Sequence, residues 1–226
     1  MSKPIIIIGV GGHAKVLLDI LKLQNRNVIG FIDKDEALKD FLVHDVPVLG
    51  NDEVLNDYNR SSIVLVNGIG SVKSMELRKK IYNNYKEKGF HFETVVHDSA
   101  VISSNVILEE GCQILAGAVI SCGCKIGENS IINTKVSVDH ESVVGKHTHI
   151  APGCTICGGV AIGNETHIGS GSIVIQLCKI GTKCLVGAGS LVLKDISDNS
   201  KVFGRPEKMI QNIYYGKKWG GVNSTP

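Results

Sequence analysis

An aliphatic residue recurs at every sixth position from Ile102 to Val192, without a miss over sixteen positions. Neither an α-helix nor a flat β-strand has a period of six, whereas a fixed short period is typical of a parallel β-helix. Each hexad would supply one short strand, three hexads would complete one coil, and the aliphatic side chain would point into the prism. Residues eighteen apart are then expected to stack at the strand spacing of about 4.8 Å.

This period predicts three columns of stacked aliphatic residues, mostly β-branched as stacked strands prefer. The first column comprises Ile102, Ile120, Val138, Ile156, Val174 and Val192. The second comprises Leu108, Ile126, Val144, Ile162 and Ile180. The third comprises Ile114, Ile132, Ile150, Ile168 and Val186.

Two other hexad positions are also restricted. Glycine often follows the aliphatic residue directly, and we expect these glycines to adopt unusual backbone angles at tight corners. They are Gly127, Gly145, Gly163, Gly169, Gly181 and Gly187. A small or slim residue stands four places after the aliphatic one, as a narrow prism requires.

Five of the seven cysteines occupy that small position, so we interpret them as core residues. The alternative is a metal site, because Cys154 and Cys157 form a CxxC pair and Cys122 and Cys124 lie upstream. Zinc needs four convergent ligands. No two cysteines are eighteen residues apart, so none would stack on adjacent coils, and we expect no metal.

Length and charge restrict the remaining function classes. The 226 residues suffice for one large or two small domains, and the net charge of +2 gives no footprint for DNA, RNA or an anionic membrane. The apolar run near the start is too short for a signal peptide, and no stretch approaches the roughly 20 apolar residues of a membrane span. We expect a cytoplasmic protein.

Residues 1–95 show a different pattern, which predicts an α/β domain. Strands are expected at Pro4–Val10, Asn27–Ile32 and Ser62–Asn67, with helices at Lys15–Gln24 and Ser74–Lys88. The second helix would bury Leu77, Ile81 and Tyr85. Alternating strands and helices imply a parallel sheet covered on both faces. This half-Rossmann domain is about half the length of a dinucleotide fold and suits a mononucleotide better.

A glycine motif, G-x-G-x-x-A from Gly9 to Ala14, directly follows the first strand and opens a helix. In that context glycines let the backbone approach a phosphate at the helix N-terminus. Asp33, at the tip of the second strand, is placed to accept hydrogen bonds from a ribose or base. A tight turn without a ligand is the alternative.

Residues 96–200 would form the β-helix, and four of the eight histidines lie within it. His140 is two places past an inward valine, at a surface corner beside acidic neighbours that favour its charged form. It suits a general base near neutral pH, although an idle surface histidine is equally compatible. His149 and His167 are eighteen apart and should stack, either lining a groove or pairing on a wet surface. Residues 201–226 would form an extended return, a short helix at Glu207–Tyr215 and a loose tail.

The chain resembles bacterial sugar acyltransferases of the left-handed β-helix, or hexapeptide-repeat, superfamily. Within it, the closest resemblance is to N-acetyltransferases of UDP-4-amino-4,6-dideoxy sugars and related sialic acid O-acetyltransferases. The motifs that carry it are Gly9–Ala14, Asn133–Thr134, Asp139–Glu141 with His149, and Phe203–Pro206. Such enzymes are homotrimers that bind acetyl-CoA between neighbouring β-helices and a nucleotide-sugar on the N-terminal domain.

The resemblance also implies roles for individual residues. His140 is expected to be the base that takes a proton from the sugar amine, and Glu141 to raise its basicity. Substrate-binding residues would be Gly11, Gly12, His13, Asp33 and Gly70. Cofactor-binding residues would be Asn133, His149, Gly158, Ser170 and Ala188. The backbone near Gly158 would stabilise the thioester oxygen as an oxyanion hole.

The leading hypothesis is therefore an acetyl-CoA-dependent N-acetyltransferase of a nucleotide-linked amino sugar, without a metal. O-acetylation of sialic acid or a similar sugar is the alternative, because the same base would serve a hydroxyl. A non-catalytic solenoid with a nucleotide-sensing domain is a second class. An NAD-dependent oxidoreductase is disfavoured by the short nucleotide domain.

Overall fold

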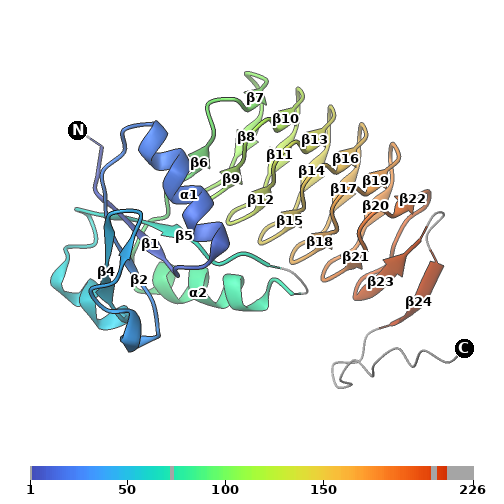
Figure 1. Ribbon diagram of the computed structural model, residues 1–226. Coiled ribbons are helices and arrows are strands. Elements are labelled where there is room, and N and C mark those ends of the chain that lie inside the picture. The colour runs from blue at the N-terminus through green and yellow to red at the C-terminus, as the bar shows by residue number, and fades with distance from the viewer. Residues whose placement is uncertain (1, 72–73, 205–207, 213–226) are drawn as a thin grey trace, which may run out of the picture.

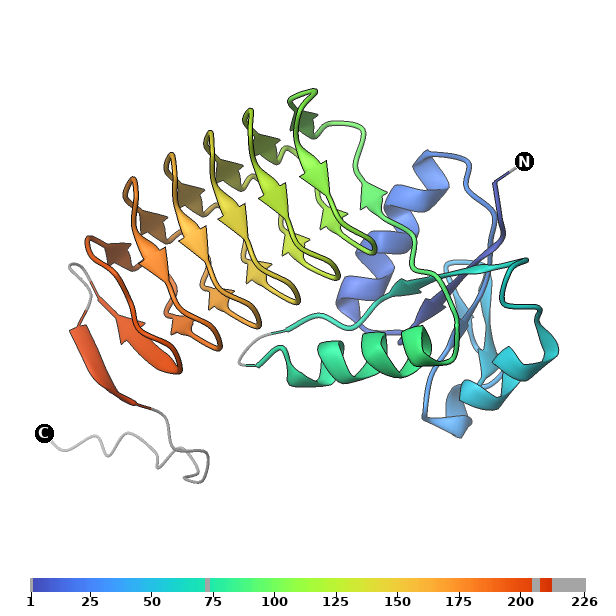
Figure 2. The ribbon, with the colours of Figure 1, turned by 180° about the vertical axis from the view of Figure 1, so that it is seen from behind.

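A computed structural model describes residues 2–71, 74–204 and 208–212. An α/β domain stands at one end, and a row of stacked coils runs away from it toward the C-terminus (Figure 1). Seen from behind, helix α2 (Glu76–Glu87) lies alongside the first coils (Figure 2). Within the described part of the chain, no helix is long and apolar enough to cross a membrane.

The N-terminal sheet has the order β3-β4-β2-β1-β5. Its strands are β1 (Ile5–Ile8), β2 (Val28–Ile32), β3 (Leu42–Val43), β4 (Val46–Gly50) and β5 (Val64–Asn67). β4, β2, β1 and β5 are parallel, and β3 is an antiparallel edge strand. The parallel core confirms the expected half-Rossmann domain, but β3 and β4 and the 3₁₀ helices η1 (Glu36–Leu38) and η2 (Asp52–Asp57) were not expected.

Helices cover both faces of this sheet, as expected. Side chains of α1 (Gly12–Leu23) pack with Ile5, Ile7 and Phe31 on one face. Tyrosines of α2 pack with Ile6, Ile8 and Ile32 on the other.

The expected buried face of α2 was wrong in part. Leu77 is 57% exposed, and the buried residues are Arg78, Tyr82 and Tyr85. The apolar spacing misled because this helix lies between the sheet and the β-helix, where it buries a hydrogen-bonded arginine and two tyrosines. The hydrophobic period alone therefore predicted a buried face of α2 that is shifted by about one residue from the observed one.

Short parallel strands form the β-helix, and the stacked columns are confirmed. Ile120 pairs with Ile102 and Val138, each eighteen residues away, and the other columns follow the same register.

The three faces are the sheets β7-β10-β13-β16-β19-β22, β8-β11-β14-β17-β20 and β6-β9-β12-β15-β18-β21-β23-β24, called here the first, second and third faces. All strands from β6 to β22 have two residues: Val95–Val96, Val101–Ile102, Ile107–Leu108, Gln113–Ile114, Val119–Ile120, Lys125–Ile126, Ile131–Ile132, Ser137–Val138, Val143–Val144, His149–Ile150, Thr155–Ile156, Ala161–Ile162, His167–Ile168, Ile173–Val174, Lys179–Ile180, Leu185–Val186 and Leu191–Val192.

Glycines after the aliphatic residue do not supply the unusual backbone angles, which corrects that expectation. In each hexad from Gly111 to Gly189, the residue with φ between 53° and 73° stands three places after the aliphatic one. Glycine is needed directly after the aliphatic residue because a side chain at that position would have no space. A Cβ on Gly163 would lie 2.6 Å from the carbonyl carbon of Gly181, on the next coil.

The small inward residues form a ladder of side-chain hydrogen bonds. Eight of them donate to the backbone carbonyl fifteen residues later, as Ser130 does to Gly145 at 2.8 Å and Cys154 to Gly169 at 3.1 Å. The remaining members are Cys112, Cys124, Ser142, Thr148, Thr166 and Ser172. This confirms that the cysteines at this position belong to the core, where Cys112 is fully buried.

The expected extended return is confirmed at Lys201–Phe203, but the expected helix after it is not. Strand β23 (Ser200–Phe203) extends the third face, and β24 (Lys208–Asn212) pairs antiparallel with it. A helix was expected at Glu207–Tyr215, but the free edge of β23 pairs with the chain as a strand instead. The expected tail at Gly220–Pro226 lies outside the described residues.

Candidate active site

The glycine loop between β1 and α1 opens a cleft against the third face of the β-helix. A Cβ atom on Gly11 or Gly12 would meet nothing within 4 Å, so both glycines leave open space. The Asp33 carboxylate secures the loop, because its Oδ2 accepts from the Val10 N–H at 3.2 Å. This inter-domain cleft, of about 570 Å³, is lined by Gly9, Val10, Gly11, Gly12, His13, Val16, Asp33, Gly68, Ile69, Gly70, Ser71, Leu115, Asn133, Thr134 and His149.

A second cavity adjoins the inter-domain cleft at the same edge of the sheet. It has a volume of about 750 Å³ and shares Gly9, Asp33 and Ile69 with the cleft. Because the carboxyl ends of β1, β2 and β5 converge there, it lies at the point where open α/β sheets bind ligands. The two volumes together would admit an elongated ligand.

His13 joins the two domains. Its Nε2 lies 2.7 Å from Oε1 of Gln113, whose Nε2 in turn donates to the Asn67 carbonyl at 2.8 Å. The amide orientation of Gln113 therefore makes His13 Nε2 the donor. Burial, assisted by the nearby Arg78 charge, lowers the pKa of His13 to about 4, so the imidazole is neutral near pH 7.

His149 and His167 stack on adjacent coils, as expected, with ring centroids 4.9 Å apart. They do not lie on a wet surface, because Ser71 covers both of them. Its Oγ lies 2.9 Å from Nδ1 of His149 and 3.2 Å from Nδ1 of His167. Burial, reinforced by the neighbouring His167, lowers the pKa of His149 to about 2, and burial also lowers that of His167.

Arg78 is a fully buried cation that holds the floor of the cleft. Its Nε donates to the Asn129 carbonyl at 3.0 Å, and its Nη1 donates to the carbonyls of Asn67 and Ile69. Burial lowers its pKa to about 9, yet the guanidinium remains charged at neutral pH. These bonds fix the loop after β5 against the β-helix.

His140 lies outside the inter-domain cleft, on an exposed corner after the first face. Its backbone N–H donates to Oδ1 of Asp139 at 2.8 Å, and its carbonyl accepts from the Gly159 N–H at 2.8 Å. The imidazole covers Gly158, which stands eighteen residues later. Glu141 is also exposed, and its carboxylate covers Gly123 on the preceding coil.

The expected cofactor residues divide between two corners of the prism. Asn133, Ser170 and Ala188 follow strands of the third face, whereas Gly158 follows a strand of the first face. Ser170 and Ala188 are exposed and stack one coil apart. Within a single chain, the first face therefore separates His140 and Gly158 from Asn133 and the cleft.

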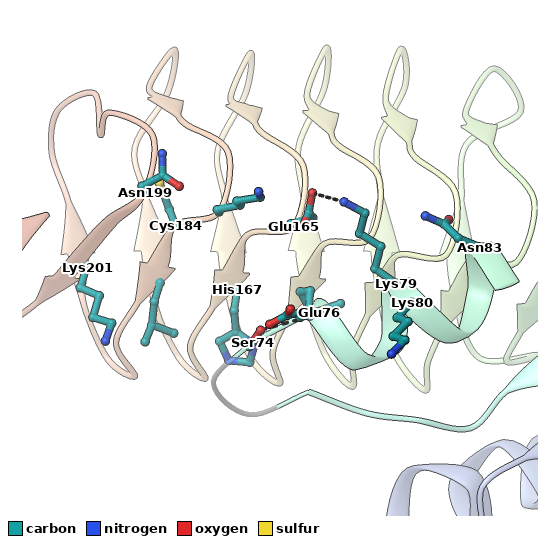
Figure 3. Close-up of a pocket in the computed structure, with 13 residues that line it drawn as sticks. Ser74, Glu76, Lys79, Lys80, Asn83, Glu165, His167, Cys184, Asn199 and Lys201 are labelled. Atoms are coloured by element: carbon teal, nitrogen blue, oxygen red, sulfur yellow. Dashed lines mark hydrogen bonds and ion pairs between the residues drawn. The ribbon is translucent and has the colours of Figure 1, made fainter. Parts of the chain in front are cut away.

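Another cleft, of about 550 Å³, lies between α2 and the third face. His167 lines it, together with lysines from α2 and from the coils (Figure 3). Lys79 pairs with Glu165 across this cleft at 2.7 Å. No group of three or more metal-binding side chains occurs among residues 2–71, 74–204 and 208–212.

Similar proteins identify the family. The PglD N-terminal domain family matches residues 4–85. PerB from Caulobacter crescentus, solved in complex with CoA and GDP-perosamine, is 34% identical over 93% of this chain and 99% of its own, with a TM-score of 0.85. A mutant of perosamine N-acetyltransferase from the same organism is 33% identical over 93% of this chain and 98% of its own, with a TM-score of 0.86. The chain belongs to the hexapeptide-repeat sugar acetyltransferases.

Two further solved structures match over a similar extent. The acetyltransferase domain of PglB from Neisseria gonorrhoeae, solved with acetyl coenzyme A, is 28% identical over 93% of this chain and all of its own, with a TM-score of 0.85. WeeI from Acinetobacter baumannii, at 22% identity and a TM-score of 0.82, shares the fold. The resemblance drawn from the sequence is confirmed, as is the left-handed β-helix.

Three residues of the acetyltransferase site were missed from the sequence. Ser71, Gln113 and Leu115 line or support the cleft. Ser71 follows β5, which lies next to β1, so its position after a buried strand was a usable signal. Gln113 occupies the same outward hexad position as His149 and His167, directly before the inward aliphatic residue, so the repeat period places all three on the third face.

Proposed function

We propose that this acetyltransferase transfers the acetyl group of acetyl-CoA to the amine of a nucleotide-linked sugar. The supporting observation is the inter-domain cleft, which joins the glycine loop of the nucleotide domain to Asn133 and His149 on the β-helix. Relatives of the same fold have been solved with CoA and GDP-perosamine. A UDP-4-amino-4,6-dideoxy sugar is the acceptor expected from the sequence.

The nucleotide-sugar would lie along the edge of the N-terminal sheet. Its diphosphate would approach the open backbone at Gly11 and Gly12, where the N-terminus of α1 favours negative charge. The nucleoside would extend past Asp33 into the adjoining cavity. Gly70 would contact the sugar of the nucleotide-sugar. His13 is held neutral with its proton donated to Gln113, so its Nδ1 would accept a hydrogen bond from the ligand without adding charge.

His140 would act as the general base. It takes a proton from the sugar ammonium, and the freed amine attacks the thioester carbonyl carbon directly. The tetrahedral oxyanion is stabilised by backbone N–H groups near Gly158, which His140 covers. The carbon–sulfur bond then breaks, the nitrogen of the tetrahedral intermediate loses its extra proton to the departing thiolate, and CoA leaves as the thiol while His140 keeps the proton it took from the ammonium. Glu141, on the same corner, would support the protonated imidazole.

His149 would not be the base. Asn133 Nδ2 lies 2.9 Å from its Nε2, and Ser71 occupies its Nδ1, so both ring nitrogens already have partners. Its lowered pKa makes protonation unfavourable. Asn133 and His149 would instead contact the acetyl end of the cofactor, while Ser170 and Ala188 line its arm.

The two parts of the site would meet only between chains. The cleft and His140 lie at different corners of one prism, separated by the first face. That face exposes Val101, Val119 and Ile173, which are 40–62% accessible in the single chain. Exposed apolar side chains gathered on one face are typical of a contact surface. We therefore propose a homotrimer in which His140 of one chain faces the cleft of its neighbour.

Product analysis by mass spectrometry tests the function. Purified protein is incubated with acetyl-CoA and, separately, a UDP-4-amino-4,6-dideoxy sugar, GDP-perosamine or sialic acid. Acetylation of a nucleotide-linked amine supports the proposal, and the His140→Ala variant should bind the same sugar but transfer little. Acetylation of sialic acid alone, or of none of the three, would overturn it.

A further inference from the structure

Asn133 on the β-helix and Ser71 on the N-terminal domain together fix the positions of the ring protons of His149 and His167. Asn133 Oδ1 accepts from the Thr134 N–H at 2.7 Å, so its Nδ2 is the atom that faces His149. An amide nitrogen donates, and His149 Nε2 must therefore accept. Because the ring is neutral and carries one proton, that proton resides on Nδ1.

The direction of the remaining bonds follows. His149 Nδ1–H donates to Ser71 Oγ at 2.9 Å. The Ser71 hydroxyl then has its own proton to donate, and His167 Nδ1 lies 3.2 Å away as the acceptor. His167 consequently carries its proton on Nε2 and lines the lysine-rich cleft beside α2 (Figure 3).

We infer that Ser71 is a positioning residue that holds His149 and His167 in opposite neutral tautomers, so that the sugar-binding loop sets the donor pattern at the acetyl site. The inference rests on the proposed function for the role of His149. The loop carrying Ser71 also provides Gly68, Ile69 and Gly70 to the cleft, and Arg78 anchors it through the Ile69 carbonyl. A ligand seated on this loop therefore touches the element that orients His149.

Burial is consistent with this pattern. His149 and His167 are 6% and 8% exposed, and their lowered pKa values keep both rings neutral across the physiological range. A buried ring with two fixed partners has no low-energy way to flip or exchange its tautomer. Removing the serine hydroxyl would leave the His149 N–H without an acceptor.

Nitrogen-15 spectra of histidine-labelled full-length protein test the inference. Protonated and unprotonated ring nitrogens have well-separated shifts, and His149→Gln and His167→Gln assign the signals. The wild type should show Nδ1–H for His149 and Nε2–H for His167. Ser71→Ala should release His167 from its Nε2–H form, because Ser71 is the donor to its Nδ1, and should shift the His149 Nδ1–H signal, which loses its acceptor. Ser71→Thr should retain the wild-type pattern. Ser74→Ala, which removes the hydroxyl that accepts from the Glu76 N–H at the start of α2, should leave it unchanged.

Kinetics then separates the two claims. Ser71→Ala should lower kcat about three- to tenfold, as expected for the loss of a neutral hydrogen bond, and Ser71→Thr should restore it. A wild-type His149 protonated on Nε2, or an unaltered pattern in Ser71→Ala, would overturn the inference whatever the activity. Wild-type spectra as expected without any acetyl transfer would instead overturn the proposed function and leave the tautomers established.

Discussion

The imidazole of His140 occupies the space where a side chain on Gly158 would lie, since a Cβ there would be 2.6 Å from both Cε1 and Nε2. These two residues stand eighteen apart on one corner of the prism. The proposed base and the proposed oxyanion site are therefore in direct contact, and glycine at position 158 is what permits it.

Gly158→Ala should consequently reduce acetyl transfer. Its φ is not in the left-handed region, so the backbone tolerates alanine, but the methyl group must displace the His140 ring. We expect kcat to fall by about 10²-fold, comparable to loss of a general base. In a His140→Ala background the same change should cost little more, because the displaced ring is already gone. Additive losses in the double variant would contradict the contact as the cause.

Mixed assemblies should reveal a site built between chains. Gly11→Phe would fill the cleft of one chain, and His140→Ala would remove the base of another. Neither variant alone should turn over. Co-expressed in equal amounts with different tags, random assemblies should recover about a quarter of wild-type activity, because a quarter of the sites pair an intact cleft with an intact base. No recovery in purified mixed assemblies would place both parts of the site in one chain.

Gly163→Ala should destabilise the β-helix more than Gly153→Ala. A Cβ on Gly163 would meet backbone atoms of the next coil at 2.6 Å, which side-chain movement cannot relieve. We expect a loss of about 3 kcal/mol in the free energy of unfolding. Gly153 has open space and a φ of 69°, so alanine there should cost only about 1 kcal/mol. Urea denaturation at one protein concentration compares them, and an equal or reversed order would contradict the packing argument.

The protein should lose stability as the pH falls below about 6.5. The pKa values of His13 and His147 are lowered to about 4 and that of His149 to about 2. Between these values and the ordinary histidine pKa, the unfolded chain binds protons that the folded chain excludes, so the free energy of unfolding decreases with decreasing pH.

Thermal denaturation at pH 7, 6 and 5 measures this dependence. His149→Gln should reduce the slope of the unfolding free energy against pH by about 1.4 kcal/mol per pH unit. The reason is that glutamine removes the one proton that position 149 binds in the unfolded chain but not in the folded chain. A slope identical to that of the wild type would show that His149 is not kept neutral by the fold.

The sequence predicted the repeated geometry well and the contacts between distant segments poorly. The six-residue period is sufficient for the columns through Ile120 and Val138, because each coil repeats the same local conformation. It could not show that Gly163 is needed for space, whereas Gly171 stands at a position with positive φ that residues such as Lys135 and Leu177 also adopt. Both are glycines in a turn, and only the position of the next coil separates the two cases.

In the candidate site, too, the sequence predicted the residues within motifs but not the contacts between distant segments. Motifs identified Gly11, Gly12, Asn133 and His149, which the structure brings together in one cleft. Ser71 escaped notice because its importance arises from two histidines 78 and 96 residues away. The face of α2 was misjudged for a related reason, since Arg78 is buried by carbonyls of two domains rather than by an apolar pattern.

The inward ladder makes cysteine, serine and threonine equivalent inside this β-helix. Cys112, Cys124 and Cys154 donate to the same carbonyl position as Ser130 or Thr148, and burial raises the pKa of all three thiols. A thiol here serves as a slightly larger hydroxyl. The number of cysteines on these rungs therefore says nothing about redox chemistry, and of the seven cysteines only Cys122 and Cys157 lie outside the small inward position.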